Sequence, residues 1–424
     1  MNNSSTKEQV YRNLARRRRA EKRFRFYGIA SIGFGLLCLV VLFTDIISKG
    51  IGAFSSHYLE MEITFDAERL EITDVNDSTQ VMLANYTGII RDSLHKTFPE
   101  VSRRSDKKQL YQLVSNGAGF DLQHKLENNP ELLGQTVTVS LLADDDVDLY
   151  AKYYRNSDEG SRLTEKQQGW VDELLQTQQL KKQLSRKFFT SGDSREPEMA
   201  GIRGALLGSL FTLLVTFALS FPIGIAAAIY LEEYAPKNRW TDFIEVNINN
   251  LAAVPSIIYG LLGLAIFINF MGMPRSIPLV GGLVLTLMTL PTIIISSRAA
   301  IKSVPPSIRE AALGLGASRM QVVLHHVLPL AMPGMLTGAI IGMAQALGET
   351  APLLMIGMVA FIVDLPGGIT DPATVLPVQI YLWADSPERA FTERTSAAIM
   401  VLLAFLIFMN TLAVLLRRRL ERRW

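Results

Sequence analysis

Six stretches of this 424-residue chain contain no Asp, Glu, Lys or Arg and are long enough to cross a lipid bilayer as helices. A transmembrane helix needs about 20 apolar residues to span roughly 30 Å of hydrocarbon. One such stretch can also be the core helix of a soluble protein, but six in one chain indicate a polytopic membrane protein with six transmembrane helices. The stretches are residues 26–44, 204–231, 246–274, 276–297, 320–348 and 395–416.

Charge is distributed unevenly between the parts of the chain. Residues 48–199 hold 25 acidic and 18 basic residues, a net charge of −7, whereas the other 272 residues hold 15 acidic and 24 basic residues, a net charge of +9. A polar, acidic insert within an apolar, basic framework excludes a single soluble domain and a disordered chain. It also excludes a nucleic-acid binder with one basic patch, so no nucleic-acid partner is expected.

The orientation follows from the Lys and Arg residues that flank the spans, because cytoplasmic loops hold the excess of these residues. Both ends are strongly basic, with Arg and Lys clustered at 16–25 and 417–423. We therefore predict that both termini are cytoplasmic and that residues 48–199 are extracytoplasmic. The first span is expected to remain as an anchor, since it is longer than the ~7 to 15 apolar residues of a signal-peptide core.

The extracytoplasmic insert is long enough for a core of its own. Alternating apolar and polar residues predict strands at 58–65 and 136–141, and residues 80–115 are predicted to be mainly helical. A further helix is expected to begin near Thr164, because Gln167 follows at the spacing of a capping box. The insert is therefore predicted to be an α+β domain.

Asp144, Asp145 and Asp146 form the densest acidic run of the insert. Consecutive carboxylates can bind a hard cation, but a solvated turn is the more common role of such a run. The histidines of the insert are scattered, and the single cysteine, Cys38, excludes a disulfide scaffold. We therefore predict no metal and no catalytic residues, and the sequence assigns no task to this domain.

The predicted cytoplasmic loop at 298–332 has the most specific pattern in the chain. Pro305 and Pro306 stop the preceding helix, Ser307 is a suitable N-cap, and Glu310 follows three residues later. This order predicts that a short helix begins here.

The short helix is predicted over residues 308–315, with Ala311, Ala312 and the final leucine on one side. Gly316 supplies the left-handed residue that ends it. A second short helix is predicted over residues 317–328, before a proline. Two short helices that meet at a glycine present a small apolar knob to the cytoplasm.

The segment Glu310-Ala311-Ala312, followed by Gly316 and by Leu328-Pro329, resembles the EAA loop of bacterial ABC importer permeases. The resemblance implies that the loop docks in a groove of a separate ATPase subunit. The sequence contains no G-x-x-x-x-G-K-[ST] segment that could hold ATP phosphates, so we expect a non-catalytic subunit without a cofactor. The docking residues implied by the resemblance are Arg309, Glu310, Ala311, Ala312, Gly316 and Arg319.

Three further segments, IYLEEY at 229–234, NLAAVPSIIYG at 250–260 and GETAPLL at 348–354, extend this resemblance over about residues 200–420. They are similar to the PstA-type permease subunit of bacterial phosphate importers, in a long form with an extra external domain. This implies an ABC importer permease fold in the bacterial inner membrane, and ATP-driven import of phosphate. The implied partners are a PstB-like ATPase, a PstC-like second permease, a PstS-like phosphate-binding protein and membrane lipid.

An ionisable residue lies deep in the apolar sequence. The fifth stretch is expected to continue past Glu349 to residue 363, which puts this carboxylate near the middle of a span, where a charge costs about 2.5 to 3.5 kcal/mol. Because a carboxylate repels phosphate, we assign Glu349 a gating or ion-pair role with Arg298 or a partner's arginine, with helix packing as the alternative. Thr350 could hydrogen-bond a passing anion, and Gln345 stands where related permeases often carry arginine.

Two prolines, Pro255 and Pro291, lie within apolar stretches. Each removes one backbone hydrogen bond and so permits a helix break or a kink. A helix that begins after such a break can point its N-terminus at an anion, and an ordinary kink without ligand contact is the alternative.

The sequence thus predicts an all-α polytopic membrane protein with an inserted α+β domain. Its parts are a basic cytoplasmic tail at 1–25, a first transmembrane helix at 26–47, the extracytoplasmic domain at 48–199 and a permease domain at 200–424 with its docking loop at 300–332. The alternatives are a permease for another oxyanion, a membrane sensor, and an ion-coupled secondary transporter. The sequence shows neither a cytoplasmic output domain nor the internal repeat typical of secondary transporters.

Overall fold

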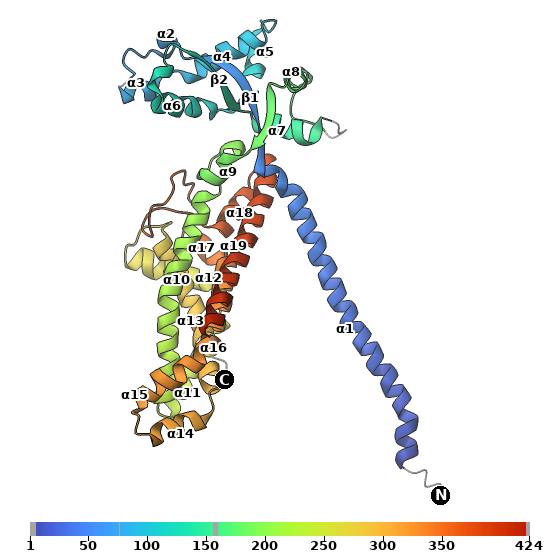
Figure 1. The fold of residues 1–424 in the computed structure, drawn as a ribbon, viewed down its shortest axis with the longest axis vertical. Coiled ribbons are helices and arrows are strands. Elements are labelled where there is room, and N and C mark those ends of the chain that lie inside the picture. The colour runs from blue at the N-terminus through green and yellow to red at the C-terminus, as the bar shows by residue number, and fades with distance from the viewer. Residues whose placement is uncertain (1–5, 76, 156–159, 421–424) are drawn as a thin grey trace. The chain divides into compact units, whose positions relative to one another are not determined.

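The computed structural model describes residues 6–75, 77–155 and 160–420. The chain divides into two compact units, residues 1–49 and 50–424. The first unit is formed by a single long helix, α1 (Thr6–Gly50), whose apolar part is long enough to cross a membrane. All other elements belong to the second unit, and their order can be followed in Figure 1.

A three-stranded antiparallel sheet forms the centre of the region between α1 and the later spans. Its strand order is β2 (Thr136–Leu142), β1 (Ser55–Thr64), β3 (Leu180–Leu184). The two predicted strands are confirmed as β1 and β2. The third strand was missed because Lys181 and Lys182 are exposed on an edge strand, which leaves no alternating pattern to recognise.

Helices pack around this sheet and bury an apolar core that includes Phe65, Phe98 and Leu122. The predicted helix near Thr164 is confirmed, with both hydrogen bonds of a capping box between Thr164 and Gln167. The helical stretch expected at 80–115 is three helices. The helices of this region are α2 (Ala67–Leu70), α3 (Ser78–Leu83), α4 (Tyr86–Thr97), α5 (Arg104–Tyr111), α6 (Ala118–Asn128), α7 (Asp145–Leu149), α8 (Glu165–Gln176) and α9 (Arg186–Thr190).

Four long apolar helices form the body of the rest of the unit (Figure 1). Small residues let them approach closely, since a side chain at Gly282 would meet Val215 at 2.5 Å and one at Gly224 would meet Ile293 at 2.6 Å. These contacts hold the first two of the helices side by side. The helices are α10 (Arg203–Ile229), α13 (Pro278–Lys302), α16 (Leu328–Gly348) and α19 (Ala390–Leu420).

The stretch predicted as a span at 246–274 is not a straight helix. It consists of α11 (Arg239–Ala252) and a second helical segment, α12 (Ser256–Gly263) continued by the π-helix η6 (Leu264–Phe270), and the two are bent by 101°. In the described residues, five helices are long and apolar enough to cross a membrane, and the bent pair makes a sixth. The predicted number of spans holds only if the bent pair is counted as one.

The fifth predicted span is shorter than expected. Helix α16 ends at Gly348 and is followed by the short helix α17 (Ala351–Met355), so the predicted continuation of one helix to Val363 is wrong. Irregular backbone leads on to α18 (Leu376–Ala384). The break has a local cause, because Pro352 at the second position of α17 cannot donate the hydrogen bond that a continuous helix requires.

A cluster of buried charges links the sheet region to the start of α19. The ammonium of Lys152 lies 2.6 Å from Asp148 and 3.2 Å from Glu393, and these side chains are only 4 to 10% exposed. His57 donates its backbone N–H to Asp148 and places its ring nitrogen Nδ1 2.8 Å from the same carboxylate. Tyr153 donates to Glu393 at 3.0 Å. The charges therefore satisfy one another in a site that excludes water.

Asp148 stays charged within this cluster. Burial by itself favours the neutral acid, but the hydrogen bond from His57 and the charge of Lys152 outweigh it and hold the pKa of Asp148 below its ordinary value. Its charge therefore stabilises the fold at neutral pH, and this stabilisation is lost only when the pH falls through that lowered pKa.

We expect Lys152→Met to destabilise the protein by about 3–5 kcal/mol, because Asp148 and Glu393 then remain buried without their shared cation. The measurement is the midpoint of thermal unfolding in lipid nanodiscs. The matched control is Lys166→Met, which breaks a pair with Asp106 in which the lysine is 55% exposed, and which we expect to cost about 1 kcal/mol or less. Equal midpoints for the two variants would contradict a supporting role of the buried cluster.

Candidate functional site

The loop with the most specific sequence pattern forms two helical segments that meet at a glycine. Helix α14 (Pro306–Gly314) ends at Leu315, and Gly316 follows with a φ of +88°, as predicted. The predicted N-cap, Ser307, is wrong, because α14 begins two residues earlier than predicted, with Pro305 as its N-cap residue. A proline at the first helical position has the φ that a helix needs, so this start is favourable.

The second segment differs from the prediction in length. A capping box joins Ser318 to Gln321 at the start of α15 (Arg319–Gln321), which continues as the π-helix η7 (Val322–Val327) directly into α16. Pro329 therefore does not end the segment, since it lies in the first turn of α16. The second segment of the loop and the span α16 consequently form one continuous helix.

The predicted docking residues differ in their exposure. Ala312 is 6% exposed and packs in an apolar cluster with Val322 and Val327, whereas Glu310, Ala311 and Arg319 are exposed. Ala311 and Ala312 therefore do not share one buried face, and a different set of apolar side chains points away from the protein. This docking tip consists of Leu313, Leu315 and Met320, with exposed fractions of 48, 90 and 57%.

Arg309 holds the loop against the end of α10. Its guanidinium donates to Glu233 from Nε at 3.1 Å and from Nη2 at 2.9 Å. It also donates to the carbonyls of Val304 and Ile301, which belong to the end of the preceding segment. Arg309 thus closes the base of the loop, and its donors are engaged within the chain.

Arg298 forms a second set of ion pairs at the same end of the bundle. Its Nε lies 3.1 Å from Glu232 and its Nη2 lies 2.5 Å from Glu245 on α11. Lys302 is 3.3 Å from Glu232. The neighbouring residues Glu232 and Glu233 therefore connect the π-helix η5 (Tyr230–Tyr234) to α13 and to the loop.

Sequence patterns offer no reason to assign Glu232 and Glu233 this role, although both lie in a segment that carries the family resemblance. The available signal was their position, because two adjacent carboxylates directly follow an uncharged span of 28 residues. Carboxylates at such a helix end need cations nearby, and the basic loops were the obvious source.

Glu349 lies at a helix break. It is the C-cap residue of α16, it is half-buried, and it has no side-chain partner among the described residues. Thr350, beside it, is half-buried at the N-cap of α17, and Gln345 is exposed on the last turn of α16. Arg298 is engaged with Glu232 and Glu245, so the structure does not bring it together with Glu349.

The two prolines singled out from the sequence have different surroundings. Pro255 is the N-cap residue of α12 and lies at the 101° bend between α11 and α12. Helix α13 runs from Pro278 to Lys302 through Pro291 without interruption. Of these two positions, only Pro255 therefore marks a change in chain direction.

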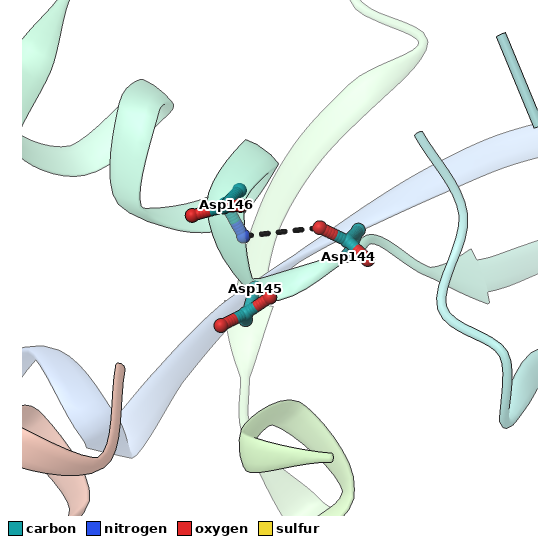
Figure 2. Close-up of side chains that lie close together, drawn as sticks. All are labelled: Asp144, Asp145 and Asp146. Atoms are coloured by element: carbon teal, nitrogen blue, oxygen red, sulfur yellow. Dashed lines mark hydrogen bonds between the residues drawn. The ribbon is translucent and has the colours of Figure 1, made fainter. Parts of the chain in front are cut away.

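The acidic run lies at the first turn of α7, and Figure 2 shows its three side chains. Asp144 caps the helix by accepting the backbone N–H of Asp146 at 3.1 Å. The three carboxylates offer oxygens within 4.8 Å of one another. Burial, reinforced by Asp145 and Glu198, raises the pKa of Asp144 to about 8, and burial raises that of Asp145 to about 6.

Comparison with known protein families gives matches for two parts of the chain. Residues 220–424 match the family model "Binding-protein-dependent transport system inner membrane component", and residues 11–159 match "Domain of unknown function (DUF3333)". The first match defines the class of the later region as the membrane component of a binding-protein-dependent transport system.

Individual relatives indicate a particular family within this class of membrane transport proteins. "Probable ABC transporter permease protein YqgI" of Bacillus subtilis is 39% identical to this chain over 41% of the chain's residues. The matched part covers 58% of that relative's length. "Phosphate transport system permease protein PstA 1" of Mycobacterium tuberculosis (strain CDC 1551 / Oshkosh) is 31% identical over 53% of this chain and 72% of its own length. The chain belongs to the PstA family of permease proteins.

One solved structure is also similar to part of the chain. It is an inward-facing conformation of the MetNI methionine ABC transporter, with 20% identity, a TM-score of 0.43, and coverage of 51% of this chain and 97% of that one.

We expect Glu233→Gln to loosen the loop, because it removes the charge that accepts two donors of Arg309. Hydrogen bonds to charged groups contribute about 1.5–3 kcal/mol, so amide exchange across α14 should become about tenfold faster or more. The measurement is hydrogen–deuterium exchange of the protein in nanodiscs. Glu310→Gln is the control, since Glu310 is exposed on the same helix. Unchanged exchange in Glu233→Gln would show that the ion pair does not hold the loop.

Proposed function

We propose that the chain is the permease subunit of an ATP-driven importer that moves phosphate inward after an external binding protein delivers it. The observation that carries this proposal is the exposed docking tip on a loop whose base is closed by Arg309 and Glu233. Three large apolar side chains exposed at the end of a well-supported loop are typical of a contact with another protein. The resemblance to the PstA family supports phosphate as the substrate.

The contacts of the loop can transmit a displacement of α14 to the membrane-spanning helices. A force on α14 reaches η5, at the end of α10, through Arg309 and Glu233. It reaches α16 through Ala312, which packs against Val322 and Val327 of η7, because η7 continues into that helix. The ion pairs of Arg298 with Glu232 and Glu245 also connect α11 and α13 to this set of linked helices. ATP-driven closure of an ATPase subunit would thus displace the inner ends of several helices as one body and switch the pathway between outward-open and inward-open states.

The proposed assembly contains four kinds of subunit or partner. A PstB-like ATPase would bind the docking tip, a PstC-like permease would complete the pathway, and a PstS-like protein would deliver phosphate from outside. The chain itself would be non-catalytic and would lie in the bacterial inner membrane with both termini in the cytoplasm. The extracytoplasmic domain would comprise residues 48–199 and the permease domain residues 200–424.

The proposed gate is the break between α16 and α17. Glu349 is half-buried there without a partner among the described residues, and a helix break gives the chain a point at which it can bend. A carboxylate repels phosphate, so Glu349 would act on an arginine of the second permease rather than on the anion. Thr350 and Gln345 lie next to this break and would line the same part of the path.

We expect Glu310→Lys to abolish coupling between ATP hydrolysis and transport while the protein still inserts and folds. The change reverses a charge at the proposed contact, and the exposed Glu310 side chain forms no hydrogen bond or ion pair with another described residue. Phosphate uptake into proteoliposomes that contain the whole complex should fall about tenfold or more, and co-purification of the ATPase should weaken. The control is Glu131→Lys, the same change at an exposed position of the outer domain. Normal uptake by Glu310→Lys would count against docking at this loop.

We expect Glu349→Gln to reduce phosphate uptake by about tenfold or more without affecting assembly, since the amide keeps the shape and removes the charge needed for an ion pair. Uptake is measured in the same proteoliposomes, with sulfate and arsenate as competitors. A normal rate of phosphate uptake by this variant would indicate that Glu349 serves helix packing instead. Competition by sulfate as strong as that by arsenate would indicate a permease for another oxyanion.

A further inference from the structure

A cavity of about 320 Å³ lies in the sheet region, far along the chain from the docking loop. It is lined by α4, by α5 with the loop that follows it, by the first turn of α6 and by Asp144, and it is partly open to solvent. Its size is at the lower end of the range for sites that hold a small molecule, roughly 300–1,000 Å³. The side chains with hydrogen-bonding capacity on its wall are Thr87, Arg91, Lys108, Tyr111, Gln112, Ser115, Asn116 and Asp144.

Two cations line this cavity without a carboxylate partner in the described part of the chain. They are Arg91 on α4 and Lys108 on α5. The nearby carboxylates are engaged elsewhere, since Asp92 pairs with Arg69 and Asp106 pairs with Lys166. The two cations are therefore left available to an anion from solution.

The local charge is opposite to that of the domain as a whole. Residues 91–108 hold six basic and three acidic residues, a net charge of +3, within a segment whose net charge is −7. A concave surface of one sign concentrates counter-ions at its centre. Small anions would thus be attracted to this cavity although the domain is acidic overall.

The cationic side of the cavity is held in place by aromatic residues. The guanidinium of Arg91 lies 4.9 Å from the centre of the Tyr111 ring, an arrangement that fixes the arginine side chain. The hydroxyl of Tyr111 is 2.6 Å from Nε2 of His95. Burial, with a smaller contribution from Lys107, lowers the pKa of His95, so its ring is neutral at neutral pH and can accept a hydrogen bond from the Tyr111 hydroxyl.

The opposite wall adds partial positive charge rather than negative charge. Gly119, in the first turn of α6, lines the cavity, and the N-cap residue Gly117 has no side chain that could cap this helix. A helix N-terminus carries partial positive charge, although the N–H groups of Gly117, Ala118 and Phe120 already bond within the chain. The one carboxylate on the wall, Asp144, has a pKa raised to about 8 by burial, so it is largely protonated at neutral pH.

We propose that this cavity is a binding site for a small oxyanion, held between Arg91 and Lys108 and separate from the transport pathway. The ligand class is a tetrahedral anion, either free phosphate or the phosphate group of a small ester. Such a site would let the outer domain respond to the anion outside the membrane. The proposal does not depend on the proposed function, because binding to this chain requires neither the ATPase nor the binding protein.

The test is calorimetric titration of the purified full chain in nanodiscs with inorganic phosphate, in a buffer without other oxyanions. Glycerol phosphate and sulfate are titrated in parallel to distinguish a free oxyanion from an ester. We expect saturable binding, and at least a tenfold weaker affinity for the double variant Arg91→Gln, Lys108→Gln. The control is Arg103→Gln, Arg104→Gln, which removes the same charge from exposed positions of the same segment that do not line the cavity.

The proposal is supported if the first double variant loses affinity and the second keeps it. It is overturned if phosphate does not bind saturably, if both double variants weaken binding equally, or if neither does. Both changed residues of the first variant are exposed, so its thermal unfolding should match that of the control and a loss of affinity would not reflect misfolding.

Discussion

The ion pair in which Arg309 donates two hydrogen bonds to one carboxylate oxygen of Glu233 is the interaction on which the functional geometry depends. It fixes the start of α14 against the end of α10, and the two backbone carbonyls that Arg309 also reaches hold the turn between α13 and α14. Without this contact, a nine-residue helix with one buried side chain would have little to keep its direction. With it, the apolar tip has a defined position relative to the spans.

Two groups of largely buried charge pairs lie in the second unit, and each includes a pair that joins elements distant in sequence. At one end of the long helices, Glu232 and Glu233 pair with cations of α13 and α14. Near the sheet, Lys152 lies between Asp148 and Glu393. The apolar surfaces between these places pack by shape and small residues, so the ion pairs contribute direction and specificity where the helices end.

Short sequence patterns correctly predicted several structural features that depend on residues close together in the chain. Uncharged length indicated the membrane helices, the spacing of Thr164 and Gln167 predicted a capped helix, and Gly316 predicted a left-handed residue between two helical segments. Features that depend on partners distant in sequence were not predictable in the same way. That the chain bends at Pro255 but not at Pro291, the edge strand β3 and the pairing of Arg298 with Glu232 are decided by packing, which a single sequence does not display. Glu349 was placed within a span because its neighbours are apolar, and the proline that ends the helix was overlooked.

The buried charge cluster has a consequence for how the protein is made. Lys152 and Glu393 are separated by 241 residues, so the ribosome completes the sheet region long before the acidic partner on α19 exists. Until that helix is inserted, Lys152 lacks one of its two carboxylates, and the surface that will cover it is missing. Folding of the sheet region is therefore completed only after the last helix has been translated. A prematurely terminated chain would leave the contact surface around Lys152 uncovered and accessible to quality-control proteases.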